Sequence, residues 1–317
     1  MTGPAPVPLS HTPTPLDGAP RLSDALGVEL LVKRDDLTGL ALGGNKARKL
    51  DHLLADALAR GCDVLVTGGG TQSNHVRQTA AAARRAGLDC HAVLAGPEPP
   101  VPSGNVLLDL LLGASIEHTG ATGYYEIEQA IEAAAEALER SGRRPYAIPI
   151  GGASAPGVRA YAAAARELTG QRADVDWVFV ADGSGGTHAG LLAGFGTSGP
   201  RVVGVDVGTR PDLDDVVPRL AAQAAGPGGS TGRCVVDHDH AGPAYGELSP
   251  EASDALRLAA RTEGLLLDPV YTAKAFAAMR TWIRAGLVAP GATVCFWHTG
   301  GHPALFASRY ATAVAAP

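Results

Sequence analysis

Residues 32–50 read VKRDDLTGLALGGNKARKL, and residues 64–77 read VLVTGGGTQSNHVR. In both stretches a short apolar run leads into glycines, and the glycines lead into a helical pattern. A strand, a tight glycine turn and a helix in that order are typical of parallel α/β proteins, whose ligands bind at the carboxyl ends of the strands. We therefore expect both turns to lie at one ligand site.

The first turn places Lys46 directly after two glycines and an asparagine, at the expected start of a helix. Only four of the 26 basic residues are lysines: Lys33, Lys46, Lys49 and Lys274. An amine can form a Schiff base, whereas a guanidinium cannot. Alone, Lys46 would more often be a surface lysine. At a helix start, however, the positive end of the dipole should lower its pKa, which favours covalent chemistry. The other three lysines lack such a setting.

The second turn clusters donors at a helix start, in Gln72, Ser73 and Asn74. Such donors suit an anionic carboxylate and a phenolic or carbonyl oxygen. A helix N-cap would account for Ser73, but not for three polar residues that follow three glycines.

A third glycine turn, DGSGGTHAG over residues 182–190, follows the apolar run WVFVA. Its glycines let backbone N–H groups turn toward a ligand, and the helix that follows adds a positive dipole end, so the turn suits a phosphate group. No lysine follows the glycines, which excludes a Walker A loop, and a Rossmann dinucleotide site is disfavoured by the spacing. A tight turn that needs glycine only for packing is the alternative.

Two further clusters were weighed as metal sites. Residues 237–240 (DHDH) lie in a polar stretch without a partner cluster, so a solvated loop is the better interpretation. His298 and His302 bracket two glycines, which make a poor helix and exclude a zinc site of the HExxH type. We expect no metal site.

The composition limits the class of protein. The 317 residues are 45% hydrophobic, enough for two domains or one large α/β domain. A net charge of −6 without a basic tail argues against a nucleic-acid partner. We expect neither a signal peptide nor a membrane span, since the N-terminus is proline-rich and no apolar run is long enough. Four scattered cysteines are typical of a reducing compartment, so we expect a cytoplasmic protein.

Strands and helices are expected to alternate after an extended arm over residues 1–20. Strands are expected at residues 29–33, 63–67, 91–94, 115–118, 146–148, 177–181, 201–206, 234–238 and 293–297. Helices are expected at residues 21–26, 46–60, 73–86, 104–112, 126–141, 158–168, 189–195, 212–225, 250–263, 273–285 and 303–317. This order predicts doubly wound parallel sheets with right-handed crossovers.

The chain resembles the pyridoxal-phosphate enzymes of fold type II, the tryptophan-synthase-β class. Within that class it resembles the family of 1-aminocyclopropane-1-carboxylate deaminase and D-cysteine desulfhydrase. The matching stretches are residues 33–50, 67–81 and 183–190, YGELSPEA (245–252), EGLLLDPVYTAKA (263–275) and FWHTGGHPALF (296–306). The resemblance implies a two-domain α/β fold with parallel sheets wrapped by helices. The large domain, which binds pyridoxal phosphate, would comprise residues 1–48 plus 154–317, and the small domain residues 49–153.

The resemblance also implies roles for individual residues. Lys46 would carry the cofactor as a Schiff base and then act as the base. The other catalytic residues would be Ser73, Tyr245 and Tyr271. The cofactor would further be held by Asn74, Ser184, Gly185, Gly186, Thr187 and Thr299, and the amino-acid substrate by Gln72, Ser73, Asn74 and Thr272.

Two positions separate the branches of this family. The deaminases carry glutamate where this chain has Thr272 and leucine where it has Thr299, whereas the desulfhydrases carry threonine at both. A hydroxyl beside the pyridine nitrogen leaves that nitrogen unprotonated, and this weaker electron sink suffices for β-elimination. Ala273 departs from the family pattern, in which glycine is expected.

We therefore expect a carbon–sulfur lyase that converts D-cysteine to pyruvate, ammonia and hydrogen sulfide. The open alternatives are a related lyase acting on cysteate, β-chloroalanine or serine, a ring-opening deaminase, a β-replacement synthase, and a cofactor-binding protein without turnover. The resemblance implies a homodimer.

Overall fold

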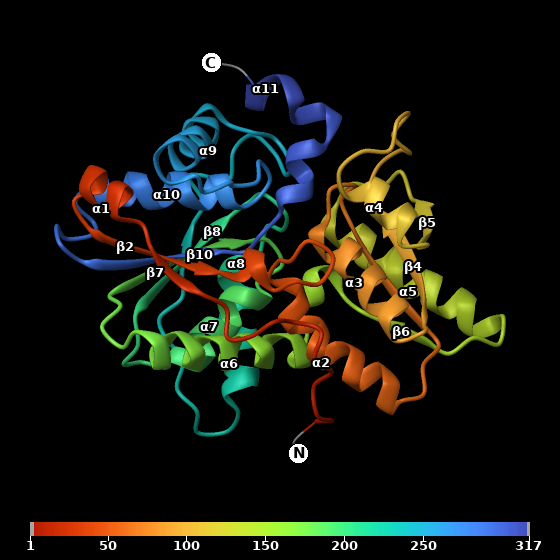
Figure 1. Cartoon of the computed structure of the whole chain (residues 1–317). Coiled ribbons are helices and arrows are strands. Elements are labelled where there is room, and N and C mark those ends of the chain that lie inside the picture. Colours follow the sequence, from red (N-terminus) through yellow and green to blue (C-terminus); the bar gives the residue numbers. More distant parts are fainter. Residues whose placement is uncertain (1–2, 316–317) are drawn as a thin grey trace.

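The computed structural model describes residues 3–315, so the outermost residues of the predicted N-terminal arm and C-terminal helix lie outside the described residues. The strands form two separate sheets (Figure 1). The six-stranded sheet has the order β1-β2-β10-β7-β8-β9, with bounds Leu16–Gly18, Glu29–Arg34, Thr293–His298, Trp177–Asp182, Arg201–Asp206 and Val235–Asp237. The four-stranded sheet has the order β5-β4-β3-β6, with bounds Ser115–His118, Asp89–Leu94, Val64–Gly69 and Pro145–Ala147. All pairs are parallel except β1 with β2.

Helices cover both faces of each sheet (Figure 1). On the large sheet, one face carries α6 (Ala155–Gln171), α7 (Gly186–Phe195) and α8 (Leu213–Ala225), and the other carries α1 (Pro20–Leu26), α9 (Pro250–Glu263) and α10 (Thr272–Arg284). On the small sheet, one face carries α2 (Lys46–Ala59) and α3 (Asn74–Arg85), and the other carries α5 (Tyr124–Arg140). The short α4 (Asn105–Leu111) packs against α3. Within residues 3–315, no helix combines the length and apolar character needed to cross a membrane.

The predicted alternation of strands and parallel sheets is confirmed, and the C-terminus needs correction. In place of one helix from residue 303, two 3₁₀ turns (His302–Phe306 and Ser308–Tyr310) precede the short α11 (Ala311–Ala315). Ala307 between the turns has extended backbone, with φ −74° and ψ 130°. This break lets Ala304, Ala307 and Tyr310 pack together against Val270, which a continuous helix would prevent.

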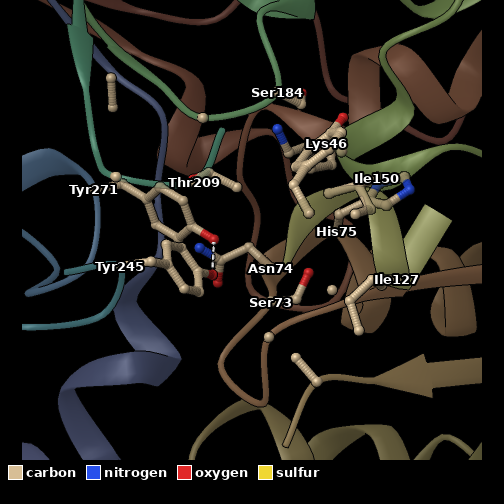
Figure 2. A pocket seen from close by; sticks show the side chains of 18 of the residues that line it. Lys46, Ser73, Asn74, His75, Ile127, Ile150, Ser184, Thr209, Tyr245 and Tyr271 are labelled. Carbon is tan, nitrogen blue, oxygen red and sulfur yellow. Dashed lines mark hydrogen bonds between the residues drawn. The ribbon is translucent and has the colours of Figure 1, made fainter. Parts of the chain in front are cut away.

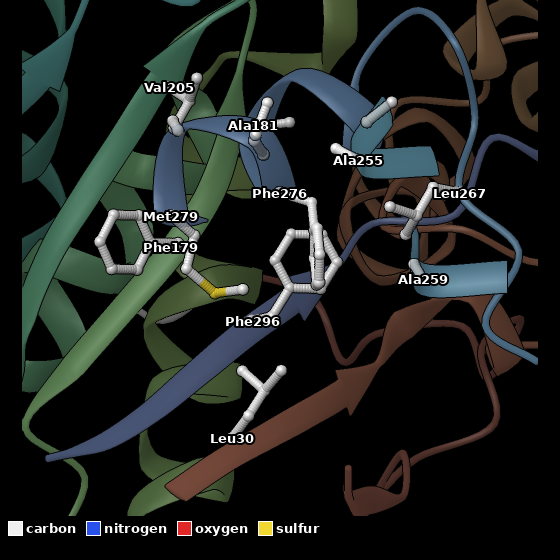
Figure 3. Close-up of a cluster of buried hydrophobic side chains, with 14 of the residues drawn as sticks. Leu30, Phe179, Ala181, Val205, Ala255, Ala259, Leu267, Phe276, Met279 and Phe296 are labelled. Atoms are coloured by element: carbon white, nitrogen blue, oxygen red, sulfur yellow. The ribbon is translucent and has the colours of Figure 1, made fainter. Parts of the chain in front are cut away.

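The apolar strands make a rigid frame for their own carboxyl ends. Figure 3 shows the cluster between the large sheet and α10, where Phe276 and Phe296 meet edge to face with ring centroids 5.2 Å apart. Met279 and Phe179 fill the same layer. Strands buried on both faces carry such continuous apolar runs, which explains the pattern read from the sequence.

The end of β2 carries a buried carboxylate, Asp35, on which four segments converge. Its oxygens accept hydrogen bonds from Thr14 (2.9 Å), Arg48 (2.8 Å), Tyr161 (2.5 Å) and the indole N–H of Trp297 (2.8 Å). These partners belong to the N-terminal arm, α2, α6 and β10. Because a buried charge is tolerated only when it is paired and hydrogen-bonded, this network fixes the position of all four segments.

Helices α6 and α7 approach each other closely at Gly190, the last glycine of the third turn. A Cβ at Gly190 would lie 2.3 Å from the Cβ of Tyr161 and 2.5 Å from the carbonyl oxygen of Val158. The packing interpretation therefore accounts for this glycine. It does not account for the glycines at the start of α7, which are described below.

Replacing Gly190 by alanine should lower the free energy of unfolding by about 1–3 kcal/mol, because the added methyl overpacks the contact between α6 and α7. The matched control is Gly170→Ala, also helical but with no atom within 4 Å of the new methyl. It should raise the free energy of unfolding by about 0.5 kcal/mol. Urea denaturation measures both, and equal effects of the two substitutions would contradict the packing argument.

Candidate active site

A pocket opens at the carboxyl ends of strands from both sheets (Figure 2). Its empty volume is about 880 Å³, open mouth included. Residues predicted for the site that line this pocket are Lys46, Ser73, Asn74, Ser184, Tyr245, Tyr271 and Thr299. Figure 2 shows Lys46 and Ser184 on one side, the two tyrosines on the other, and Ser73 and Asn74 between them. The structure thus brings all three glycine turns to one place.

The turn that carries Lys46 requires glycine. Gly43 and Gly44 have φ values of 68° and 125°, which favour glycine over any other residue. A Cβ at Gly43 would also lie 1.9 Å from the carbonyl oxygen of Asp36. The chain is thereby forced back over the end of β2, and Lys46 begins α2 with its side chain in the pocket wall.

Lys46 is partly buried in the pocket wall. Burial lowers the pKa of Lys46 to about 8, although the negative charge of Asp182 opposes the shift. The direction predicted from the sequence is confirmed, but burial rather than the helix dipole is the main cause. With that pKa, about one tenth of the amine is unprotonated at pH 7, far more than for an exposed lysine.

The second turn contributes two side chains to the pocket. Ser73 is the N-cap of α3, and its hydroxyl accepts a hydrogen bond from the N–H of Val76 at 3.3 Å. The N-cap role of Ser73 is confirmed. Ser73 and Asn74 also line the pocket, and their contact with the substrate stays a prediction.

Gln72 is not among the residues that line the pocket, and its contact with the substrate stays a prediction. Its amide nitrogen donates to the carbonyl oxygen of Ser103 at 3.1 Å, and its amide oxygen accepts from the N–H of Asn105 at 2.9 Å. Gln72 therefore holds the start of α4 against the second turn.

The third turn is shaped by Asp182, the last residue of β7. Its carboxylate accepts from the N–H of Gly185 at 3.0 Å and pairs with the ring nitrogen Nδ1 of His188 at 2.8 Å. Gly185 has a φ of 85°, and α7 begins at the next residue. The first N–H groups of a helix have no acceptor within it, so those of Gly186 and Thr187 remain able to bind an anion beside Ser184.

The two predicted tyrosines form a pair on the opposite wall. The hydroxyls of Tyr245 and Tyr271 lie 2.5 Å apart. Burial raises the pKa of Tyr245 to about 12 and also raises that of Tyr271. Both phenols are therefore protonated at neutral pH. One proton is used in the hydrogen bond between the two hydroxyls, and the other can be donated to a group in the pocket.

Thr272 is fully buried and does not line the pocket, and its contact with the substrate stays a prediction. Its hydroxyl donates to the carboxylate of Asp268 at 2.6 Å. The same carboxylate accepts from the N–H groups of Val270, Tyr271 and Thr272. Thr272 therefore shapes the turn that presents Tyr271.

Lys49 lies beside the start of α7 and does not itself line the pocket. It is fully buried, its amine donates to the carbonyl oxygen of Gly151 at 2.9 Å, and a Cβ on Gly186 would lie 2.9 Å from that amine. Burial and the charge of Lys46 hold the pKa of Lys49 well below its usual range. The sequence could have indicated this position, because Lys46 and Lys49 are three residues apart and residues at that spacing share a face of a helix.

The histidines at the end of β10 form a hydrogen-bonded cluster. His298, His302 and Asp36 offer ligand atoms within 4.8 Å of one another. The Nε2 atoms of both histidines, however, contact the carbonyl oxygen of Leu266 at 2.8 and 2.9 Å. The carboxylate of Asp36 is engaged by the guanidinium of Arg34. The atoms that could bind a metal ion are thus already engaged by other groups of the protein.

Comparison with known proteins identifies the chain. The model of the family "Pyridoxal-phosphate dependent enzyme" matches residues 7–300. The chain belongs to this family. It is 41% identical to a D-cysteine desulfhydrase of Klebsiella pneumoniae over 94% of both chains, and 43% identical to one of Yersinia enterocolitica over 93% of both chains. It also superimposes on a crystal structure described as an ACC deaminase homologue with a TM-score of 0.89 and 38% identity, covering 99% of this chain and 96% of the other.

These findings establish the cofactor and the fold class. Members of the family depend on pyridoxal phosphate, so this chain is a pyridoxal-phosphate enzyme. Its two parallel sheets wrapped by helices are the fold type II architecture expected from the sequence.

The pKa of Lys46 predicts how its reactivity depends on pH. In cofactor-free protein, labelling of Lys46 by the neutral reagent fluorodinitrobenzene should speed up about fivefold from pH 7 to 8 and less than twofold from pH 8 to 9, because the free amine saturates above its pKa. Mass spectrometry at low conversion gives the rate at this residue, and Lys46→Arg is the control for assigning the label. A rate that still rises tenfold per pH unit above pH 9 would refute the lowered pKa.

Proposed function

We propose that the protein is a carbon–sulfur lyase that converts D-cysteine and water to pyruvate, ammonia and hydrogen sulfide. The observation that carries this proposal is Thr299 in the wall of the pocket that also contains Lys46. A threonine at this position is the feature that led us to the desulfhydrase branch. The relatives that are 41–43% identical over 93–94% of their length are D-cysteine desulfhydrases, which supports the same substrate.

The residues present fit pyridoxal phosphate. The pocket contains a lysine whose pKa is low enough to supply a free amine. A Cβ at Gly151 would lie 2.5 Å from the hydroxyl of Ser184, so a glycine keeps this side of the pocket open. Free N–H groups at the start of α7 and the amine of Lys49 provide donors for a phosphate.

In this proposal Lys46 holds the cofactor covalently, and Ser184, Gly185, Gly186 and Thr187 form the phosphate loop. Lys49 adds an amine donor beside that loop, because its amine lies against Gly186. Asn74 would donate to the cofactor's ring oxygen, and the hydroxyl of Thr299 would interact with the ring nitrogen. When bound, pyridoxal phosphate supplies the electron sink that makes the proton on the substrate's Cα acidic.

The chain's own residues then bind the substrate and move its protons. Ser73 and Asn74 bind the substrate carboxylate. The amine of Lys46, once free, takes the Cα proton at its Nζ, for which a pKa near 8 is suitable. Tyr245 and Tyr271 keep their protons, and the hydroxyl of the pair that does not donate to the other donates from the opposite wall to the side where the thiol leaves.

The quaternary and domain organisation are part of the proposal. We propose a large domain of residues 1–48 plus 154–317 and a small domain of residues 49–153, which agrees with the division of strands between the two sheets. A homodimer in the cytoplasm is proposed by analogy with the family.

Ring-opening deamination of 1-aminocyclopropane-1-carboxylate is the second candidate, because the superimposed structure is described as an ACC deaminase homologue. Thr272 and Thr299 weigh against it. The deaminase branch of the family that the chain resembles carries glutamate and leucine, respectively, at these two positions.

The deciding experiment adds D-cysteine to the purified yellow protein. Pyruvate and sulfide should form in equal amounts, and Lys46→Ala should lose both the visible absorption band and at least 10³-fold of the activity, because the covalent nucleophile and base are removed. Cysteate, β-chloroalanine, serine and the cyclopropane amino acid form the comparison panel. If any of these compounds is turned over faster, that compound replaces D-cysteine as the proposed substrate. Consumption of a second nucleophile without formation of pyruvate would indicate a synthase.

The assignment of Lys49 is tested separately. Lys49→Met should weaken binding of pyridoxal phosphate at least tenfold and make the cofactor-free protein more stable, because a buried amine that costs stability is replaced by an apolar chain. The matched control is Lys33→Met, another fully buried lysine, whose partner Glu167 lies outside the pocket. It should lower stability and leave the affinity unchanged. Unchanged affinity in Lys49→Met would remove Lys49 from the phosphate site.

A further inference from the structure

A single buried guanidinium connects three of the segments around the pocket. Arg77 lies in α3 and is fully buried. Its Nη1 donates to the Oδ1 of Asn74 at 2.9 Å and to the Oδ1 of Asn105 at 2.6 Å, and its Nη2 donates to the carbonyl oxygen of Gly43 at 2.8 Å. Arg77 therefore ties together the start of α3, the start of α4 and the turn before Lys46.

These contacts fix the orientation of both asparagine amides. An arginine side chain has donors only, so the amide atom that faces it must be an oxygen. With its oxygen on Arg77, Asn105 turns its Nδ2 to the Oδ1 of Asn74 at 2.9 Å and to the carbonyl oxygen of Gln72 at 2.9 Å. The Oδ1 of Asn74 thus accepts two hydrogen bonds.

The opposite end of the Asn74 amide is left for a ligand. No hydrogen bond among residues 3–315 uses the Nδ2 of Asn74, and Asn74 lines the pocket. Figure 2 shows this side chain beside Ser73, on the floor between Lys46 and the two tyrosines. The pocket therefore meets an N–H₂ group and not an amide oxygen.

The guanidinium also brings a positive charge close behind this amide. Its three acceptors are all neutral: two amides and a peptide carbonyl. Burial lowers the pKa of Arg77 to about 10, which leaves it charged at neutral pH. Burial raises the pKa of the neighbouring Asp109 to about 8, so this carboxyl offers little counter-charge at pH 7. The charge polarises the Asn74 amide and strengthens its N–H donors.

We propose that Arg77 and Asn105 are positioning residues that lock the Asn74 amide with its N–H₂ toward the pocket, where it donates to the anionic ring oxygen of pyridoxal phosphate. The inference rests on the proposed contact between Asn74 and the cofactor. A rotated amide would place its oxygen against an anionic oxygen and repel the cofactor. The lock removes that alternative before the cofactor binds, which is preorganisation.

The substitution Asn74→Asp separates this arrangement from a merely structural one. One carboxylate oxygen would keep the two donors from Arg77 and Asn105, and the other would replace the N–H₂ group. We expect the cofactor-free protein to be at least as stable as the wild type, because Arg77 gains a counter-charge. The affinity for pyridoxal phosphate should fall at least tenfold, since a donor has become an acceptor. Thermal unfolding and titration with pyridoxal phosphate measure these two opposite effects.

Two further substitutions test the positioning residues themselves. Arg77→Lys keeps the charge, but one ammonium cannot hold the same three acceptors, so the affinity should fall about tenfold and the visible band of the bound cofactor should shift. Asn105→Ala removes one of the two donors to the Oδ1 of Asn74 and should lower the affinity for pyridoxal phosphate about threefold. Arg84→Lys is the matched control, since Arg84 lies on the same helix and pairs with Asp89 at the surface. It should change neither quantity.

The proposal is overturned if Asn74→Asp binds pyridoxal phosphate as tightly as the wild type. It is also overturned if Asn105→Ala loses stability with unchanged affinity and unchanged absorption. These two substitutions decide the matter even if Arg77→Lys does not fold. None of these measurements uses a substrate, so the failure of D-cysteine as substrate would leave their outcome intact.

Discussion

The buried carboxylate of Asp35 is the constraint on which the lysine turn depends. It follows β2 directly, and its own carbonyl oxygen accepts from the N–H of Gly44, so it holds the turn from its backbone and its side chain at once. Arg48, two residues past the lysine, neutralises its charge and also pairs with Glu167 on α6. Burial alone would raise the pKa of Glu167, but Arg48 and Lys33 lower it to about 2. Neighbouring opposite charges thus offset the free-energy cost of burying Asp35 and Glu167, and this network holds Lys46 in a fixed position.

The side of α2 that faces the pocket differs in its electrostatics, because its basic side chains are not paired with carboxylates of residues 3–315. Lys46, Lys49 and His75 lie close together, burial holds all three pKa values low, and both ring nitrogens of His75 lack a partner among the described residues. Arg77 adds a cation a little further along α3. The nearby carboxylate of Asp182 is already engaged by the third turn. A site with so many unsatisfied donors and so little negative charge is suited to a ligand that brings its own anions, as a phosphate with a carboxylate does.

The sequence predicted the parts of this site that depend on local pattern. Strand, glycine turn and helix follow each other so regularly that the sheets and the convergence of Lys46, Ser73 and Ser184 could be inferred. It could not show which polar side chains are used up by the protein itself. In the sequence Gln72 resembles a ligand-binding residue, but its side chain forms hydrogen bonds with the start of α4. Arg77 resembles an ordinary helix arginine, but it is fully buried. Such partners lie about 30 residues away along the chain, and only the packing of α3 against α4 brings them together.

The two threonines that point to the desulfhydrase branch act in different ways. Thr299 faces the pocket, whereas Thr272 gives its hydroxyl to Asp268. That carboxylate packs against the turn after Thr299, because a Cβ at Gly301 would lie 2.5 Å from its Cγ. A glutamate at position 272 would set a second carboxylate beside Asp268, and like charges in a buried place repel, so its side chain would have to turn away from the cap. Thr272 therefore supports the carboxylate of Asp268, which shapes the turn of Tyr271 and packs against the turn after Thr299. In the proposed function, the chemical choice between the branches depends on the hydroxyl of Thr299.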